Sequence, residues 1–261
     1  MKGVILDIVP EAAIVDISHA VQAFDVLDGA LAISQAYSYF PNGTVHVVVV
    51  DPGVGTERRP ILASSDAYHF VAPDNGVLSM VYAREERMHV RHITAEHYFR
   101  QPVSATFHAR DVFAPVAAYL AKQVDSHKFG DEIEDYVRFA APKPKAVAEN
   151  RIRGVVMKVD RFGNLITNVD APTLAVLDPA GGGGLHVELG GGPAAPVVSY
   201  YGAVAPGAVG AVLGSSGHLE LFVNRGSATV LLGAGPGTPL RVRRAADATG
   251  RARGAGPRTE R

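Results

Sequence analysis

The feature that most constrains the fold is a run of valines that ends abruptly at a carboxylate. Val45 and residues 47–50 are β-branched, whereas Asp51 is followed by Pro52 and Gly53, which cannot continue a strand. Such a run predicts a strand covered on both faces and central in a parallel sheet. Ligands of these sheets bind beyond the carboxyl ends of the strands. Asp51 therefore lies where a site would be built, although Asp is also common in turns.

The segments around this strand alternate between strand and helix patterns. We expect short strands at residues 13–17, 61–63 and 68–72, and helices at residues 25–39, 77–83 and 112–124. Residues 1–9 are apolar, but so short a segment is typical of neither element. Alternation at these intervals predicts an N-terminal α/β domain with a mostly parallel sheet, over residues 1–140.

The pattern changes after residue 140. Residues 141–150 begin with a Pro- and Lys-containing stretch and are predicted to be a linker. Beyond them, short apolar stretches alternate with Gly and Pro and show almost no helical periodicity. They lie at residues 154–159, 165–169, 185–189, 209–213, 219–222, 229–232 and 240–242. This spacing predicts a smaller all-β barrel over residues 151–242, followed by a disordered Arg/Ala/Gly-rich tail over residues 243–261.

Composition excludes several classes of protein. The formal net charge is -1, which argues against a nucleic-acid partner. The chain has no cysteine, hence no disulfide framework and no thiolate metal site. No apolar run reaches the roughly 18 residues that cross a membrane. The N-terminal segment is interrupted by Asp7 and Pro10 and makes a poor signal peptide. We therefore expect a cytoplasmic protein.

Three residues form the first candidate for chemistry. Asp51 and Arg58 flank a Gly-rich loop, and His108 lies at another junction between a loop and a helix. If the fold brings them together, His108 could take a proton, Asp51 could orient a water, and Arg58 could hold negative charge on its oxygen. Spacing alone leaves open that they are three separate surface residues.

Two further groups of loops offer ligand-binding chemistry. Residues 160–164 place Phe162 between Asp160 and Asn164, which suits a flat heterocycle but is also ordinary hairpin chemistry. Residues 214–218 and 224–227 offer hydroxyls and a guanidinium for a carboxylate, or are simply solvent loops. No spacing of histidines predicts a metal site.

Taken together, these segments resemble a known family. The motifs that carry the resemblance lie in order at residues 15–19, 39–59, 72–78, 106–115, 160–168, 214–217 and 224–226. From residue 1 to about residue 232 the chain is similar to the S-adenosyl-L-methionine (SAM) hydroxide adenosyltransferases, hydrolase relatives of the SAM-dependent fluorinase and chlorinase.

The resemblance implies an activity and an assembly. It implies hydrolysis of SAM to adenosine and L-methionine by activated water attacking the ribose C5′. It also implies a homotrimer that binds SAM between the N-terminal domain of one subunit and the C-terminal domain of its neighbour. Because a sulfonium is already a good leaving group, an oriented and partly desolvated water suffices, with no metal and no cofactor besides the substrate.

The resemblance also implies roles for particular residues. The family's Asp-Arg-His triad falls on Asp51, Arg58 and His108. The implied substrate-binding residues are Phe24, Asp160, Phe162, Asn164, Ser215 and Asn224. Relatives that bind halide carry other residues at positions 51 and 108. A carboxylate at residue 51 would repel a halide, so hydrolysis is favoured over the alternative of a SAM-dependent halogenase.

One departure from the family concerns the first strand. Family members carry a strand and an Asp-Phe-Gly-like loop ahead of the segment that begins at Met1, and neither Asp7 nor Asp16 matches the ribose-binding Asp of that loop. The sequence leaves two explanations open, a start codon assigned too late or a non-catalytic homologue that binds SAM or adenosine. Without that strand, backbone groups of its neighbour would be exposed.

Overall fold

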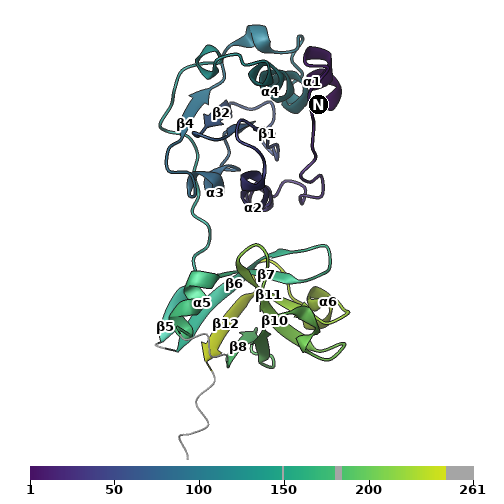
Figure 1. Cartoon of the computed structure of the whole chain (residues 1–261), viewed down its shortest axis with the longest axis vertical. Helices are drawn as coiled ribbons and strands as arrows, with labels where there is room; N and C mark the ends of the chain where they lie inside the picture. The colour runs from purple at the N-terminus through teal and green to yellow at the C-terminus, as the bar shows by residue number, and fades with distance from the viewer. Residues whose placement is uncertain (149, 180–183, 245–261) are drawn as a thin grey trace, which may run out of the picture. The chain divides into compact units, whose positions relative to one another are not determined.

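The chain forms two compact units, Met1–Ala141 and Pro142–Arg261 (Figure 1). The computed structural model describes residues 1–148, 150–179 and 184–244. The first unit is a mixed α/β sheet domain and the second contains a closed barrel.

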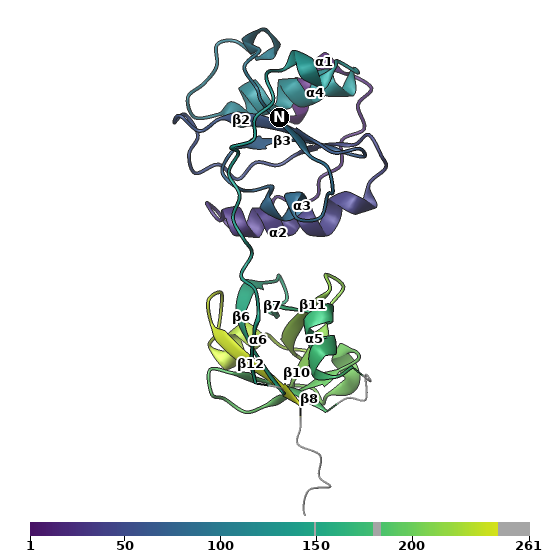
Figure 2. The same cartoon turned by 90° about the vertical axis from the view of Figure 1, so that its left-hand side faces the viewer.

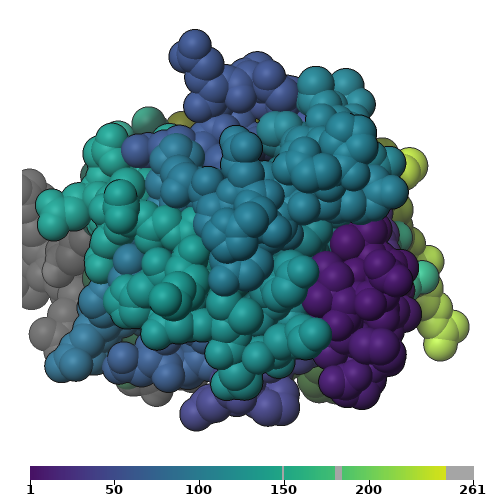
Figure 3. All heavy atoms as spheres, turned by 90° about the horizontal axis from the view of Figure 1, so that it is seen from above, coloured from purple at the N-terminus to yellow at the C-terminus, as the bar shows by residue number. Residues whose placement is uncertain are grey.

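The first unit has three layers. Its sheet contains β1 (Val45–Val47), β3 (His69–Pro73), β2 (Pro60–Ser64) and β4 (His89–His92), in the order β1-β3-β2-β4. Helices α2 (Val26–Ala36) and α3 (Ser79–Tyr82) cover one face, whereas α1 (Lys2–Ile8) and α4 (Ala114–Ala121) lie on the other (Figure 2). Helix α1 packs against α4. In Figure 3 the N-terminal residues, in purple, lie beside the blue and teal residues that come later in this unit.

The prediction for the valine run is correct in one respect and wrong in another. Val45 and Val47 pack into the core beneath α4, whereas Val48 is buried in the core beneath α2, so both faces are covered. However, β1 ends at Val47, so residues 48–50 and Asp51 lie in the loop that follows rather than at the strand end. Strand β1 also lies at the edge of the described sheet and pairs only with β3. The sequence before it folds as helices and coil, so no described strand lies beyond β1.

The prediction of a mostly parallel sheet is also wrong. Only β1 and β3 are parallel, because β2 pairs antiparallel with both β3 and β4. Strand β4 was not predicted from the sequence, and residues 13–17, predicted as a strand, are coil.

The predicted helices of this unit are present with different ends. Helix α2 begins after Asp25, whose carboxylate accepts a hydrogen bond from the Asp28 amide at 2.9 Å. A 3₁₀ turn, Tyr37–Tyr39, follows it. The predicted helix at residues 77–83 is reduced to α3, and α4 is preceded by a π-helical segment, Ala109–Phe113.

The second unit contains a barrel of seven strands. Their order is β12-β8-β9-β10-β11-β7-β6, and antiparallel pairing of β12 with β6 closes the barrel. Strand β5 extends the sheet beyond β6. The bounds are β5 Lys145–Ala148, β6 Arg151–Val159, β7 Leu165–Asp170, β8 Leu185–Leu189, β9 Ala195–Val198, β10 Val209–Leu213, β11 His218–Val223 and β12 Pro239–Arg244. One apolar cluster, including Val187, Leu219 and Leu221, fills the interior.

Several segments of this unit differ from the sequence-based expectation. Residues 229–232, predicted as a strand, belong to helix α6 (Ala228–Leu232), because Ser227 caps its N-terminus through the Val230 amide. Helix α5 (Ala171–Leu177) was not predicted and is capped by Asp170. Strand β5 lies within the expected linker. Arg243 and Arg244 belong to β12, and the remainder of the predicted tail lies outside the described residues.

Within the described residues, the helices are too short or too polar to cross a membrane.

Candidate functional site

The loop after β1 is held in place by backbone contacts. The Val54 amide donates to the Asp51 carbonyl at 3.3 Å, and the Thr56 hydroxyl donates to the Gly53 carbonyl at 2.7 Å. Gly55 adopts a φ of +78°, and a Cβ there would lie 2.2 Å from the Ala105 carbonyl oxygen. This contact requires glycine and brings the loop against the segment that leads to His108.

The structure brings Asp51, Arg58 and His108 together. The Arg58 guanidinium binds Asp51 in a bidentate manner, through Nε to Oδ1 at 2.9 Å and Nη2 to Oδ2 at 2.5 Å. The same Nη2 lies 2.8 Å from His108 Nδ1. The Asp51 and Arg58 side chains are only 7% and 8% exposed, so the pair is largely shielded from water. Arg58 is thus the central member of the group.

This geometry determines the tautomer of His108. A guanidinium can only donate hydrogen bonds, so His108 Nδ1 must accept, and in the neutral ring the proton lies on Nε2. The pKa of His108 is lowered from its ordinary value, chiefly by burial and further by the positive charge of Arg58. His108 is therefore neutral at physiological pH and presents Nε2–H as a donor.

Arg58 has one end without a partner. Its Nη1 is buried and forms no hydrogen bond within the described residues, while its guanidinium carbon lies 5.3 Å from the centre of the Phe113 ring. Buried polar groups are normally satisfied by protein or by water. Nη1 is thus available to a water or to a group of a ligand.

The segment before His108 is fixed by a buried carboxylate. Asp111 accepts a hydrogen bond from the Ser104 amide at 2.9 Å and binds Arg110 through both oxygens at 2.7 Å. Arg110 is the main reason that the pKa of Asp111 falls to about 2. Asp111 is therefore ionised at physiological pH and anchors the 104–108 segment.

Phe24, in the first unit, has an unusual backbone conformation. Its φ is +66°, which is uncommon for a residue with a Cβ, and the residue is 80% exposed. An exposed aromatic ring on strained backbone is consistent with the predicted role in lining a binding site.

Three of the predicted residues of the second unit lie in one loop between β6 and β7. Asp160 Oδ1 accepts hydrogen bonds from the amides of Phe162 and Asn164 at 2.8 and 2.9 Å, and Asp160 Oδ2 accepts one from Asn164 Nδ2 at 2.9 Å. The Phe162 ring stays largely exposed. The Arg161 guanidinium carbon lies 5.5 Å from the centre of this ring, so the loop holds an acid and an amide rigidly beside an exposed aromatic ring that has a cation over it.

The two remaining predicted residues lie at opposite ends of β11. Asn224 directly follows the strand and donates to the Val204 carbonyl at 2.6 Å. It lies on the side of the Asp160 loop, because Leu221 pairs with Leu165. Ser215 lies in the turn that precedes β11 and is exposed. Glu220 lies next to both regions, because a Cβ on Gly214 would lie 1.8 Å from its Oε1 and the charge of Asp160 acts on its carboxyl group.

The sequence did not single out Glu220, a buried carboxyl group on β11. It is 6% exposed and accepts a hydrogen bond from the Tyr201 hydroxyl at 3.1 Å. Burial raises its pKa. A Cβ on Gly214 would lie 1.8 Å from Glu220 Oε1, so a larger residue there would require the Glu220 side chain to move. A glutamate between two leucines, Leu219 and Leu221, was the sequence signal that could have indicated a buried carboxyl group.

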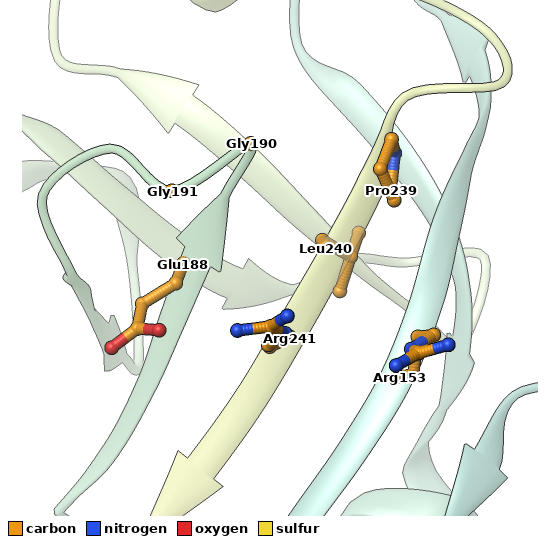
Figure 4. A pocket seen from close by; sticks show the side chains of 7 residues that line it. All are labelled: Arg153, Glu188, Gly190, Gly191, Pro239, Leu240 and Arg241. Carbon is orange, nitrogen blue, oxygen red and sulfur yellow. The ribbon is translucent and has the colours of Figure 1, made fainter.

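A groove of about 500 Å³ lies on the outside of the barrel (Figure 4). It is lined by Arg153, Glu188, Gly190, Gly191, Pro239, Leu240 and Arg241. Arg153 and Arg241 occupy facing positions of β6 and β12. None of the predicted site residues lines this groove. The described residues also contain no cluster of three or more His, Asp or Glu that could hold a metal ion.

The chain matches both domains of one protein family. The SAM hydroxide adenosyltransferase N-terminal domain matches residues 1–130, and the corresponding C-terminal domain matches residues 154–241. Together these matches cover most of the chain.

Similar proteins of known name cover almost the whole length. A protein of Thermus thermophilus named (R)-S-adenosyl-L-methionine hydrolase is 39% identical, over 93% of this chain and 92% of its own. A protein of the same name from Salinispora tropica is 37% identical, over 92% of this chain and 90% of its own. A fluorinase of Nocardia brasiliensis is 30% identical, over 87% and 85%.

The same fold occurs in solved structures. A crystal structure of an uncharacterised conserved protein from Thermotoga maritima is similar with a TM-score of 0.87 and 36% identity, covering 93% of each chain. A conserved hypothetical protein from Thermus thermophilus is similar with a TM-score of 0.72 and 36% identity, covering 92% of this chain and 91% of its own.

Proposed function

Because the chain belongs to the SAM hydroxide adenosyltransferase family, we propose that it hydrolyses SAM to adenosine and L-methionine. The single observation that carries the proposal is the buried constellation of Asp51, Arg58 and His108. The relatives named (R)-S-adenosyl-L-methionine hydrolase support the (R) epimer at sulfur as the substrate.

The reaction is a displacement at the ribose C5′. A water forms the C5′–O bond while the C5′–S bond breaks, and the electron pair of that bond goes to sulfur. The sulfonium thereby becomes the neutral thioether of methionine. The water loses one proton, which is released to solvent at the end of the reaction. Because the leaving group is neutral, the chemistry calls for no metal and no cofactor.

The geometry suggests a particular division of labour. The sequence suggested that His108 takes a proton, but His108 Nδ1 already accepts a hydrogen bond from Arg58, so we propose that its Nε2–H donates to the water instead. Each oxygen of Asp51 accepts one hydrogen bond from Arg58 and keeps a further lone pair, so the carboxylate can take the water's proton. Arg58 orients both partners, and its Nη1 offers another donor to the developing hydroxide.

The proposed binding residues come from both units. Asp160 and Asn164 are proposed to contact the methionine amino group and the adenine, and Ser215 the methionine carboxylate. Phe24, Phe162 and Asn224 are proposed to complete the binding surface. Family resemblance also supports a homotrimer. From composition and sequence pattern we further propose a cytoplasmic location and domains over residues 1–140 and 151–242.

Direct incubation tests the proposed function. The chain is mixed with (R)- or (S)-SAM, and adenosine and methionine are quantified by chromatography. We expect equimolar products from the (R) epimer, and a large loss of turnover in Asp51→Asn. If a folded chain leaves both epimers intact but binds adenosine in calorimetry, the non-catalytic alternative is correct.

A second incubation tests the halogenase alternative. The 30% identical fluorinase motivates it, whereas the carboxylate of Asp51 opposes it through repulsion of a halide. With fluoride or chloride added to SAM, we expect adenosine and no 5′-halogenated nucleoside. Accumulation of a halogenated product would replace the proposed hydrolysis.

A further inference from the structure

The turn that follows β3 connects the two ends of the loop that carries Asp51 and Arg58. Asp74 and Asn75 form this turn and lie within the family motif at residues 72–78. Asn75 contacts the residue before Asp51, and Asp74 contacts the residue after Arg58. Neither turn residue has a hydrogen bond to Asp51, Arg58 or His108 within the described residues.

Asn75 fixes the first end of the loop. Its Nδ2 donates to the Val50 carbonyl at 2.8 Å, and its Oδ1 accepts from the Val77 amide at 3.1 Å. The two bonds together define the orientation of the amide. A Cβ on Gly29 of α2 would lie 2.7 Å from Val50 Cγ2 and 3.2 Å from Val77 Cγ2, so α2 packs closely against both residues. Val50 is thereby held both by the Asn75 amide and by α2.

Asp74 fixes the second end. Its amide donates to the Arg59 carbonyl at 2.8 Å, and its Oδ2 accepts from Arg59 Nε and Nη2 at 3.0 and 2.7 Å. Its Oδ1 accepts from the Val137 amide at 2.8 Å. The Asp74 side chain is only 3% exposed, so these bonds are protected from water. The carboxylate is a rigid anchor for Arg59.

From these contacts we propose that the Asp74–Asn75 turn sets the separation of Asp51 and Arg58, and that Asn75 is a positioning residue for hydrolysis. The inference rests on the proposed function, since it acts through the proposed catalytic group. Its physical basis is that one short turn holds residues 50 and 59, which flank the whole loop. A shift of about 1 Å in such a group lowers turnover about 100-fold.

The test is the isosteric substitution Asn75→Asp. Its carboxylate still accepts from the Val77 amide, but an ionised oxygen now faces the Val50 carbonyl and repels it. When the new carboxyl is protonated, its O–H donates to Val50 and restores the contact. At pH 8 we expect kcat to fall about 10- to 100-fold with little change in KM. The ratio of mutant to wild-type kcat rises as the pH is lowered.

Asn168→Asp is the matched control. Asn168 makes the same pair of bonds in the second unit, from Nδ2 to the Pro142 carbonyl at 3.0 Å and from the Val155 amide to Oδ1 at 2.8 Å. Asn168→Asp therefore loses the same kind of hydrogen bond, but at residues remote in sequence from Asp51, Arg58 and His108. We expect lower stability, with a kcat ratio that does not change with pH.

The outcomes separate the inference from the proposed function. If the wild-type chain forms no adenosine, the proposed function fails. If the wild type is active and N75D keeps its kcat at every pH, or loses it with no recovery at low pH, the positioning role is wrong. Should N75D be unfolded throughout, Asn75→Ala removes the hydrogen bond to the Val50 carbonyl without adding a charge and must still lower kcat about 10-fold at constant KM. An unchanged kcat in N75A would then overturn the inference.

Discussion

Gly55 provides a quantitative test of how the two loops that carry the proposed catalytic group, Asp51, Arg58 and His108, are held together. A Cβ at this position would lie 2.2 Å from the Ala105 carbonyl oxygen, whereas ordinary contact begins near 3.4 Å. In Gly55→Ala the loops must therefore separate by about 1 Å. Because Arg58 Nη2 and His108 Nδ1 are 2.8 Å apart, such a movement breaks their hydrogen bond.

The loss of unfolding free energy in Gly55→Ala has two parts, one from the backbone conformation and one from the close contact. A residue with a Cβ in the left-handed region costs about 1–2 kcal/mol, and forced overpacking adds about 1–3 kcal/mol. Gly43→Ala is the matched control, because Gly43 has a similar φ of +84° and no atom within 4 Å of its Cβ position. We expect G55A to lose about 2–5 kcal/mol and G43A to lose only the backbone part.

The two variants also differ in activity. Urea denaturation gives the loss of stability, and adenosine formation under saturating SAM gives kcat. We expect kcat of G55A to fall about 100-fold, whereas G43A stays near the wild-type value. If G55A is as stable as G43A and retains its kcat, the close contact does not hold the catalytic loops.

Four further predictions concern three titratable groups, His46, Glu220 and His108. Burial among aromatic rings lowers the pKa of His46 to about 4, so only the neutral ring is compatible with its place in the folded protein. This preference contributes about 3 kcal/mol to the free energy of unfolding, which is present above about pH 6.5 and lost as the pH falls towards 4. The urea midpoint of the wild type should fall across this pH range, and that of His46→Phe should fall less. Equal falls in the two proteins would show that His46 does not cause the loss of stability. Burial raises the pKa of Glu220, so its stabilising contribution is lost as the pH rises; Glu220→Gln should raise the thermal midpoint more at pH 8 than at pH 4, and the reverse order would refute this. His108→Ala should lower kcat by a larger factor than it lowers the affinity for SAM measured by calorimetry. Equal factors would indicate that His108 has a structural role. In the wild type, kcat should decline on the acid side with a midpoint below 6.5, because protonated His108 cannot accept from Arg58.

The sheet shows which parts of the fold could be predicted from the sequence. The β-branched run before Asp51 correctly predicted a strand with both faces covered. Its place at the sheet edge depends on distant pairing that local pattern does not encode. The antiparallel pairing of β2 and β3 could have been predicted, because the loop from Ser64 to His69 is far too short for a parallel crossover.

The barrel shows how a cap can override a strand pattern. Residues 229–232 are apolar with a β-branched pair, which favours a strand by propensity. The Ser227 hydroxyl accepts from the Val230 amide, and the segment begins a helix instead. Strand propensity reflects packing context more than local preference, so the capping residue was the better signal.

The catalytic group shows a similar limit. Arg58 and His108 lie 50 residues apart, so spacing could not predict their 2.8 Å contact, whereas the order of the motifs did suggest it. The tautomer of His108 and the unpartnered Nη1 of Arg58 require coordinates. The contact on which the proposed role of Asn75 rests could not be predicted, because a turn motif does not reveal which distant carbonyl its amide contacts.

The central claim, that water attacks C5′ of SAM in this protein, is tested most directly by isotope labelling. Turnover of SAM in ¹⁸O-water, followed by mass spectrometry of both products, reports where the oxygen enters. The account predicts one ¹⁸O in adenosine and none in methionine. Absence of adenosine from a folded and SAM-binding chain, or adenosine without the label, would contradict it.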